Sequence, residues 1–234
     1  MTAPPPPNRW REWAKSLGGA FVVWLLVRTF LVQAFHIPSE SMEGTFLIGD
    51  VLFVARPLYG AEVPFIGKHL PAIREPRHGD IVVFHSVETK GLEVVKRVIG
   101  LPGDTLQMRQ GTVLRNRLPL VEPYASYSRA GELDPPESRA LIRTWQSPRL
   151  VGVAPAAYEP DRNNWGPIVV PPDSLFVMGD NRDHSWDGRF WGFLPRGNVT
   201  GSPLVIYFSF DPSSWRPLPL ITAVRWNRLF SVPH

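Results

Sequence analysis

The sequence predicts a mainly β protein, in which an N-terminal transmembrane helix precedes a twisted antiparallel β-sheet or barrel-like domain with an inserted, loop-rich β subdomain. Three observations support this prediction. The chain has 26 prolines and 19 glycines in 234 residues, which favours short strands joined by turns. One apolar stretch near the N-terminus has the length of a membrane span. Short β-branched runs, separated by turn residues, occupy much of the remaining chain.

The N-terminal segment divides into a polar tail and an apolar stretch. Residues 1–15 contain a proline run and an excess of basic side chains, which indicates a disordered tail. From Leu17 to Phe35 the chain is mostly apolar, and as a helix it would cover about 28 Å, close to the thickness of a bilayer core. Basic residues before a span favour a cytoplasmic N-terminus. We therefore expect a tail at 1–15, an anchor at 16–35 and an exoplasmic domain at 36–234.

Two other readings of the apolar stretch stay open. A cleaved secretory signal is one, because Val32-Gln33-Ala34 is an acceptable cleavage site after an apolar region. A helix buried in the core of the protein is the other. Arg28 weakens the anchor reading, since a charge within a span is costly. Its long side chain could reach the membrane surface, which leaves open whether Arg28 lies within the membrane or at its edge.

The rest of the chain is expected to form strands, with a variable subdomain inserted at residues 105–165. Short apolar or β-branched runs bounded by glycine, proline and other turn residues read as strands. These runs lie at residues 46–55, 80–85, 93–99, 168–170, 175–178 and 204–210. Residues 122–165 contain few such runs and are rich in proline, serine, glutamate and arginine. We read that part as loop-rich.

Composition excludes several classes of function. Cysteine is absent, which excludes disulfides, thiolate catalysis and cysteine metal sites. The net charge is +4 and the pI is about 9.7, but no basic stripe with interleaved aromatic residues is present, so we expect no nucleic-acid partner. A basic chain with an apolar N-terminus fits a lipid bilayer as partner.

Two segments carry candidate catalytic side chains. Ser39 and Ser41 follow Pro38, which blocks continuation of a helix, although a serine at such a place is often only a turn residue. Lys96 lies on a predicted strand between Val94 and Val98, which share its face. Lowering a lysine pKa from about 10.4 to about 8 requires roughly 3 kcal/mol of differential destabilisation, and partial burial can supply it. The alternative is a lysine whose amine simply reaches water.

A third segment, residues 177–189, is dense in polar groups. Asp180, Asp187, Arg182 and Arg189 could pair with one another. A solvated loop is the simpler reading. A cation site is also conceivable because aspartate and asparagine supply oxygen ligands. The spacing lacks the regular pattern and terminal glutamate of a calcium loop, so we predict no metal.

Taken together, these segments resemble the type I signal peptidases, the bacterial leader peptidase family. The resemblance covers the apolar N-terminus, the core strands and the C-terminal end, but not residues 105–165. It rests on PSESM at 38–42, VVKRVIGLPGD at 94–104, MGDNRDHSWDGRFWGFLP at 178–195, GDIVVF at 79–84 and VRWNRLF at 224–230. Long motifs in this order are highly specific.

The resemblance implies a role for each matching residue. Ser41 would be the nucleophile and Lys96 the general base. The Ser39 side chain and the Ser41 backbone N–H would form the oxyanion hole, and Ser185 would orient the lysine amine. The positions that brace the site would be Arg97, Asp180, Asp187 and Arg189. The positions that line the substrate pockets would be Ile37, Pro38, Phe84 and Val95.

The resemblance also implies an activity and a location. The chain would be a membrane-bound serine endopeptidase that removes signal peptides from secreted preproteins, after small residues at the first and third positions before the cut. It would need no cofactor. It would cross the plasma (inner) membrane once, with its catalytic domain on the exoplasmic or periplasmic side. Two alternatives are a maturation peptidase with one dedicated substrate and a membrane-tethered binding protein without activity.

Two residues depart from the family pattern. Gly44 stands where the family usually has proline, which puts the rigidity of the turn after Ser41 in doubt. His184 replaces a usual asparagine and suggests a Ser–His mechanism, but Lys96 already matches the position of the base.

Overall fold

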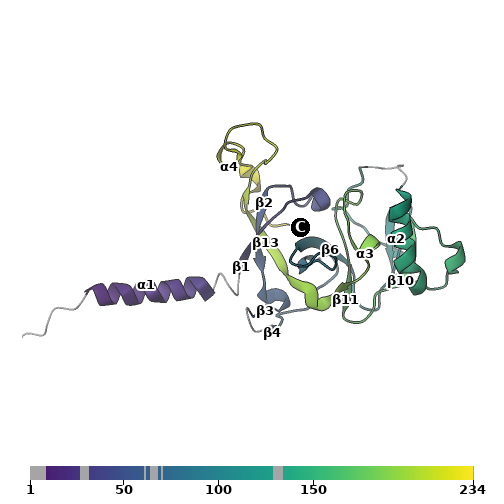
Figure 1. Ribbon diagram of the computed structural model, residues 1–234, viewed down its shortest axis with the longest axis horizontal. Helices are drawn as coiled ribbons and strands as arrows, with labels where there is room; N and C mark the ends of the chain where they lie inside the picture. Colours follow the sequence, from purple (N-terminus) through teal and green to yellow (C-terminus); the bar gives the residue numbers. More distant parts are fainter. Residues whose placement is uncertain are drawn as a thin grey trace, which may run out of the picture.

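The computed structural model describes residues 9–26, 32–60, 62–63, 68–69, 71–128 and 134–233. Within these residues the largest element is an antiparallel sheet of seven strands. In spatial order they are β1 (Val32–His36), β2 (Asp50–Ala55), β13 (Val199–Ser209), β5 (Ile81–His85), β6 (Glu93–Gly100), β11 (Ser174–Met178) and β12 (Leu194–Pro195). The sheet curls around the centre of the body in Figure 1. The prediction of a mainly β fold is confirmed.

Both faces of the sheet are buried at β5 and β6, which explains the continuous apolar runs of these two strands. Successive residues of a strand point to opposite faces. Val83 and Val95 accordingly belong to one apolar cluster, which also contains Phe35 and Met42. The residues that alternate with them pack in a second cluster, which includes Val82, Phe84, Val98 and Val177.

The inserted part of the chain contains a four-stranded antiparallel sheet. Its strands lie in the order β10 (Trp165–Val169), β7 (Thr105–Arg109), β8 (Thr112–Arg115) and β9 (Leu118–Pro119). Helix α2 (Pro136–Gln146) was not predicted; it buries Ile142 in the apolar cluster that joins this sheet to β6 and β11. Figure 1 shows α2 and β10 side by side, at the end of the body away from α1.

The remaining elements are short. A two-stranded ribbon pairs β3 (Glu62–Val63) with β4 (Lys68–His69). The other helices of the body are α3 (Gly188–Trp191) and α4 (Pro219–Thr222). Single 3-10 turns are η2 (Glu40–Met42), η3 (Pro57–Tyr59), η4 (Ser147–Arg149), η5 (Pro155–Ala157), η6 (Arg196–Asn198) and η7 (Trp226–Arg228).

The N-terminal prediction needs two corrections. Helix α1 (Arg9–Leu26) begins inside the segment predicted as a disordered tail. The C-terminal part of the predicted helix 16–35 is instead strand β1, which pairs with β2 from Val32 to His36. The reason is this pairing with β2, in which Phe35 and Ile37 enter the core while Ala34 and His36 are exposed. Arg28 lies outside the described residues.

Helix α1 extends away from the body in Figure 1. Its described side chains include exposed large apolar ones, among them Trp10, Trp13, Leu17 and Phe21. In the described part of the chain, no helix combines the length and the apolar character that a membrane span requires.

Three predicted strands have clearly different limits in the structure, and one of them, predicted at 168–170, is β10, which begins at Trp165. Of residues 46–55, only those from Asp50 form a strand, because the Leu47 N–H donates to the Asp50 carboxylate (2.8 Å) and Gly49 has a φ of +93°, which together make a turn. Strand β13 begins at Val199, five residues before the predicted start at Leu204, because its N-terminal part pairs with β5.

Candidate active site

Ser41 lies in the one-turn helix η2, between strands β1 and β2. The neighbouring Met42 is fully buried in the core and anchors the turn. Ser41 itself is 7% exposed. Its backbone carbonyl accepts a hydrogen bond from the Asn181 N–H (3.2 Å). The serine is therefore fixed from both sides, by the core and by the segment that follows β11.

Lys96 extends from the middle of β6 to this serine. Its Nζ lies 2.6 Å from Ser41 Oγ, and the residue is only 3% exposed. Burial lowers the pKa of Lys96 to about 8; Asp187 and Asp180 act in the opposite direction, and Arg189 adds to the lowering. About a tenth of this amine is therefore neutral at pH 7, far more than for an ordinary lysine, and this neutral form can accept a proton.

Ser39 and Ser185, the other two predicted hydroxyls, lie at different depths. Ser39 is exposed, and its Oγ lies 3.4 Å from Ser41 Oγ. Ser185 is buried. Its hydroxyl lies next to the Asp187 carboxylate, whose pKa it helps to lower, and in the described part of the chain it makes no hydrogen bond to Lys96.

Arg97, the neighbour of Lys96, points to the opposite side of β6 and pairs with Asp180. The guanidinium makes two bonds to the carboxylate, at 2.8 and 2.7 Å. Thr45 Oγ1 donates to the same carboxylate (2.6 Å). Both members of the pair are buried. A planar guanidinium with two bonds to a carboxylate is a rigid arrangement, so this pair fixes the segment after β11 relative to β6.

Asp187 and Arg189 form a second buried pair, at 0% exposure for both side chains. The Asp187 carboxylate also accepts the Gly179 N–H (2.9 Å). Burial alone would raise the pKa of Asp187, but Arg189, the Gly179 N–H and Ser185 together lower it. Asp187 is thus a fixed negative charge beside Lys96.

The four predicted pocket residues do not form one group. Ile37 and Val95 are buried in the apolar cluster that contains Met42. Phe84 is buried in the other cluster, where its ring lies 6.1 Å from that of Trp191. Pro38 is exposed.

Sequence reasoning missed Gly179 as a site residue. A Cβ on this residue would collide with the Ser185 hydroxyl and with the Ser41 carbonyl oxygen. The close approach of the two segments therefore requires glycine. The signal in the sequence was a glycine directly after the apolar run of β11, where an isolated glycine often marks close backbone contact.

Gly44 has a φ of +100°, which proline cannot adopt. The turn around it is nonetheless well bonded, because the N–H groups of Thr45 and Phe46 both donate to the Met42 carbonyl, at 3.1 and 2.7 Å. The glycine thus belongs to a defined turn.

His184, the second departure from the family pattern, pairs with Glu40. Its Nδ1 lies 2.9 Å from Glu40 Oε1, so the ring is engaged there and not with Lys96 or Ser41.

The carboxylates of the 177–189 segment are engaged by arginines. Asp180 is bound by Arg97, and Asp183 lies 3.6 Å from Arg162. Within the described residues, no cluster of three or more histidine or acidic side chains is arranged to hold a metal ion.

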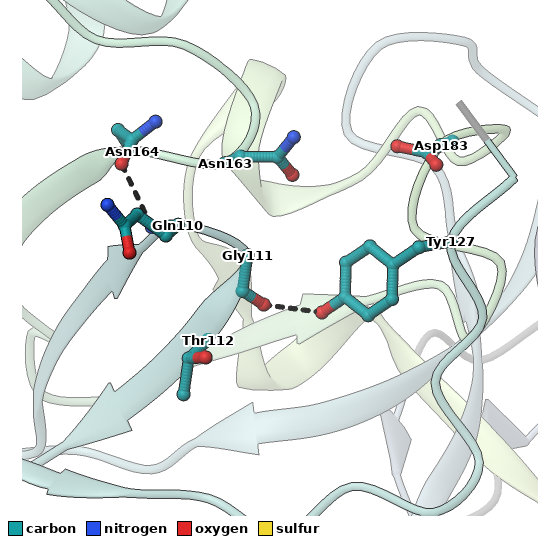
Figure 2. Close-up of a pocket in the computed structure, with 7 residues that line it drawn as sticks. All are labelled: Gln110, Gly111, Thr112, Tyr127, Asn163, Asn164 and Asp183. Carbon is teal, nitrogen blue, oxygen red and sulfur yellow. Dashed lines mark hydrogen bonds between the residues drawn. The ribbon is translucent and has the colours of Figure 1, made fainter. Parts of the chain in front are cut away.

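A cavity of about 430 Å³ lies beside this segment, on the face toward the inserted sheet. None of the predicted site residues lines it. Figure 2 shows its walls, which are Gln110, Gly111, Thr112, Tyr127, Asn163, Asn164 and Asp183.

The chain is similar in sequence to known proteins over most of its length. Residues 10–208 match the family model for signal peptidase, peptidase S26. Signal peptidase I of Leptolyngbya laminosa is 36% identical over 84% of this chain and 79% of its own length. Signal peptidase I of Bacillus licheniformis is 34% identical over 86% of this chain and 89% of its own. The solved structure of a signal peptidase I from Enterococcus faecalis is 26% identical in sequence to this chain. The match spans 56% of this chain and 98% of that chain, with a TM-score of 0.37.

The chain is a serine protease by class. More specifically, it belongs to the signal peptidase family, peptidase S26. The expected resemblance is thereby confirmed, and with it the removal of signal peptides as the activity of the enzyme.

Proposed function

We propose that this signal peptidase cleaves preproteins with a Ser–Lys pair, in which Ser41 is the nucleophile and Lys96 the general base. The buried contact of 2.6 Å between Lys96 Nζ and Ser41 Oγ supports this assignment most strongly. A nucleophile must lie within hydrogen-bond reach of its base, and the base must be neutral at the working pH. The lowered pKa of Lys96, about 8, supports the second requirement because it makes the neutral amine accessible close to neutral pH.

In the first step, neutral Lys96 takes the hydroxyl proton as Ser41 Oγ attacks the scissile carbonyl carbon of the substrate. The C–O bond forms, and the carbonyl oxygen becomes an oxyanion. The protonated amine then gives its proton to the leaving nitrogen as the C–N bond breaks, which leaves an acyl-enzyme. Water, deprotonated by the same amine, hydrolyses the ester and restores Ser41.

The oxyanion would be stabilised by the Ser41 backbone N–H and the Ser39 hydroxyl. Donors aimed at developing charge lower the barrier because they need no reorganisation during the reaction. Ser39 Oγ is already 3.4 Å from Ser41 Oγ, and its exposure leaves the hydroxyl free to turn toward a bound substrate.

The buried pairs would keep the reacting groups in place. Ser185 would orient the Lys96 amine by a rotation of its hydroxyl, which lies between Asp187 and Gly179. The pairs Arg97–Asp180 and Asp187–Arg189 would brace the segment that holds Ser41.

Specificity would come from small apolar pockets near Ser41, lined by Ile37, Pro38, Phe84 and Val95, that admit small residues at the first and third positions before the cut. The apolar N-terminal segment ahead of β1 would hold the enzyme at the bilayer, single-pass, with the domain from residue 36 on the exoplasmic side of the plasma membrane. The exposed Trp10, Trp13, Leu17 and Phe21 of α1 favour this contact with lipid. Cleavage sites emerging from the membrane would then meet the enzyme at a high effective concentration.

The test is direct cleavage. The full chain in detergent is incubated with a secretory preprotein, and the new N-terminus is sequenced. We expect cleavage after a small residue, with kcat lower by about 10⁴-fold or more in Ser41→Ala and in Lys96→Ala. Full activity in either folded variant would refute the Ser–Lys assignment. Several unrelated preproteins in the same assay distinguish a general signal peptidase from a peptidase with one dedicated substrate.

A further inference from the structure

One segment of the inserted subdomain, residues 122–127, runs beside the turn that carries Asp180. The Ser126 N–H donates to the Asp180 carbonyl (2.8 Å), and the Arg182 N–H donates to the Ser126 carbonyl (2.9 Å). The two segments are parallel where they pair. This backbone pairing joins the subdomain to the polar segment after β11.

Tyr124 covers the guanidinium of Arg97. The Arg97 Cζ lies 3.9 Å from the centre of the tyrosine ring, well within the range of a cation–π contact. The Tyr124 hydroxyl donates to Glu122 (3.0 Å). Burial and then Glu122 raise the pKa of the phenol, so the ring stays neutral. Arg97 is therefore enclosed by Tyr124 over its face and by Asp180 at its edge.

Glu122 holds the other arginine of the turn. Its carboxylate accepts two bonds from Arg182, at 2.7 and 2.9 Å, and the pair is buried. Arg182 Nε in turn donates to the Gly179 carbonyl (3.1 Å). Through Arg182, the subdomain thus fixes Gly179, where a Cβ would collide with both the Ser41 carbonyl and the Ser185 hydroxyl.

The far end of the segment is anchored in the inserted sheet. The Tyr127 hydroxyl donates to the Gly111 carbonyl (2.6 Å), in the turn between β7 and β8, as Figure 2 shows. Arg182 also contacts that hydroxyl (3.2 Å). The inserted sheet therefore holds one end of segment 122–127, and the segment contacts residues 179–182 along its length.

We propose that Tyr124 and Glu122 are positioning residues for the cleavage reaction, which hold the 179–182 turn against Ser41. Neither touches the reacting atoms. They act through Arg97 and Arg182, and then through the Asn181 N–H that donates to the Ser41 carbonyl (3.2 Å). This inference rests on the proposed role of Ser41 as nucleophile. It predicts that the insertion contributes to kcat and is more than a structural addition to the fold.

The test compares four variants of the full chain in detergent with a preprotein substrate. Tyr124→Leu removes the ring, Tyr124→Phe keeps it without the hydroxyl, and Glu122→Gln removes the charge that holds Arg182. Val121→Ala is the matched control, because Val121 is adjacent to this pair and 92% exposed. The values of kcat are divided by the folded fraction measured by circular dichroism.

We expect Tyr124→Leu and Glu122→Gln to lower kcat by about tenfold or more, with KM changed by less than about twofold, since misplaced reacting groups slow the chemical step. Tyr124→Phe should recover most of the loss, and Val121→Ala should match the wild type. A kcat per folded molecule equal to the wild type in Tyr124→Leu would overturn the inference. So would a rise in KM alone, or Tyr124→Phe as slow as Tyr124→Leu.

A second measurement needs no activity. Hydrogen exchange at the Asn181 amide reports its bond to the Ser41 carbonyl, and it should accelerate in Tyr124→Leu but not in Val121→Ala. Unchanged exchange would contradict the inference. Wild-type enzyme that cleaves nothing, or Ser41→Ala that still cleaves, would instead refute the proposed function, so the two failures are distinguishable.

Discussion

Lys96 Nζ and Ser41 Oγ lie 2.6 Å apart, although the two residues are 55 positions apart in the sequence. The lysine comes from the central part of the curled sheet and the serine from the turn after its first strand. At 3% and 7% exposure, respectively, neither is open to bulk water. This burial both lowers the pKa of the amine and shields the proton transfer from solvent, and most of the predictions below depend on it.

The first prediction concerns the pH dependence of cleavage. Because the pKa of Lys96 is lowered to about 8, the neutral amine is scarce below that pH. We expect kcat/KM to rise about tenfold per pH unit below the midpoint and to level off above it. Initial rates on a fluorogenic signal-peptide substrate between pH 5 and 10 measure this profile. A flat profile between about pH 5 and 9 would exclude lysine as the base.

The second prediction concerns stability. The folded-state pKa of Lys96 is below its usual 10.5, so between these values the unfolded chain carries a proton that the folded chain lacks. Wild-type stability therefore gains from this group as pH rises through that window. Lys96→Met has no such group. The free energy of unfolding of Lys96→Met minus that of the wild type should therefore be higher by about 3 kcal/mol at pH 7 than at pH 10.5.

Urea unfolding of both proteins at the two pH values measures this difference, and other titrating groups cancel in the comparison. An equal relative stability at both pH values would mean that the Lys96 amine is hydrated in the folded protein.

The third prediction tests the close approach at Gly179. A Cβ there would collide with the Ser41 carbonyl and the Ser185 hydroxyl, so Gly179→Ala must separate the two segments. We expect kcat to fall by about 100-fold, as displacements of about 1 Å can cause. Gly197→Ala is the matched control, since a Cβ at Gly197 meets nothing within 4 Å. Similar kcat values for the two variants would show that the contact has no role.

The fourth prediction concerns the buried pair Arg97–Asp180. Asp180→Ala leaves a buried guanidinium without its carboxylate, which should cost about 3–5 kcal/mol of unfolding free energy. Glu159→Ala breaks an exposed pair with Arg143 and should cost less than about 1 kcal/mol. Urea denaturation curves give both values. Equal losses of unfolding free energy in the two variants would mean that burial does not make the Arg97–Asp180 pair more important for stability than an exposed pair.

Much of the β core could be predicted from local sequence. The runs at 80–85 and 93–99 combine β-branched residues with clear turn boundaries, and they form β5 and β6 within one residue. Their alternation also placed Lys96 and Arg97 on opposite faces. Such signals are local, because the period of the side chains decides which face each residue takes.

Other parts depend on contacts between distant segments and left no local signal. The apolar stretch up to Phe35 has the composition of a helix that spans a membrane, but pairing with β2 makes its last residues a strand. Helix α2 lies in a segment rich in polar residues and is stabilised by burying Ile142 against the inserted sheet. The contact of Tyr124 with Arg97 joins the insertion to β6. The local sequence around either residue does not predict this contact.

Direct titration of the Lys96 amine tests the central claim best. The chain has only four lysines, Lys15, Lys68, Lys90 and Lys96, so side-chain NMR of a chain labelled with ¹³C-lysine gives few signals, and the one missing in Lys96→Met belongs to Lys96. We predict that this signal titrates with a midpoint near pH 8, as its burial requires. A midpoint above pH 10 would show a solvated amine and would contradict its role as the base for Ser41.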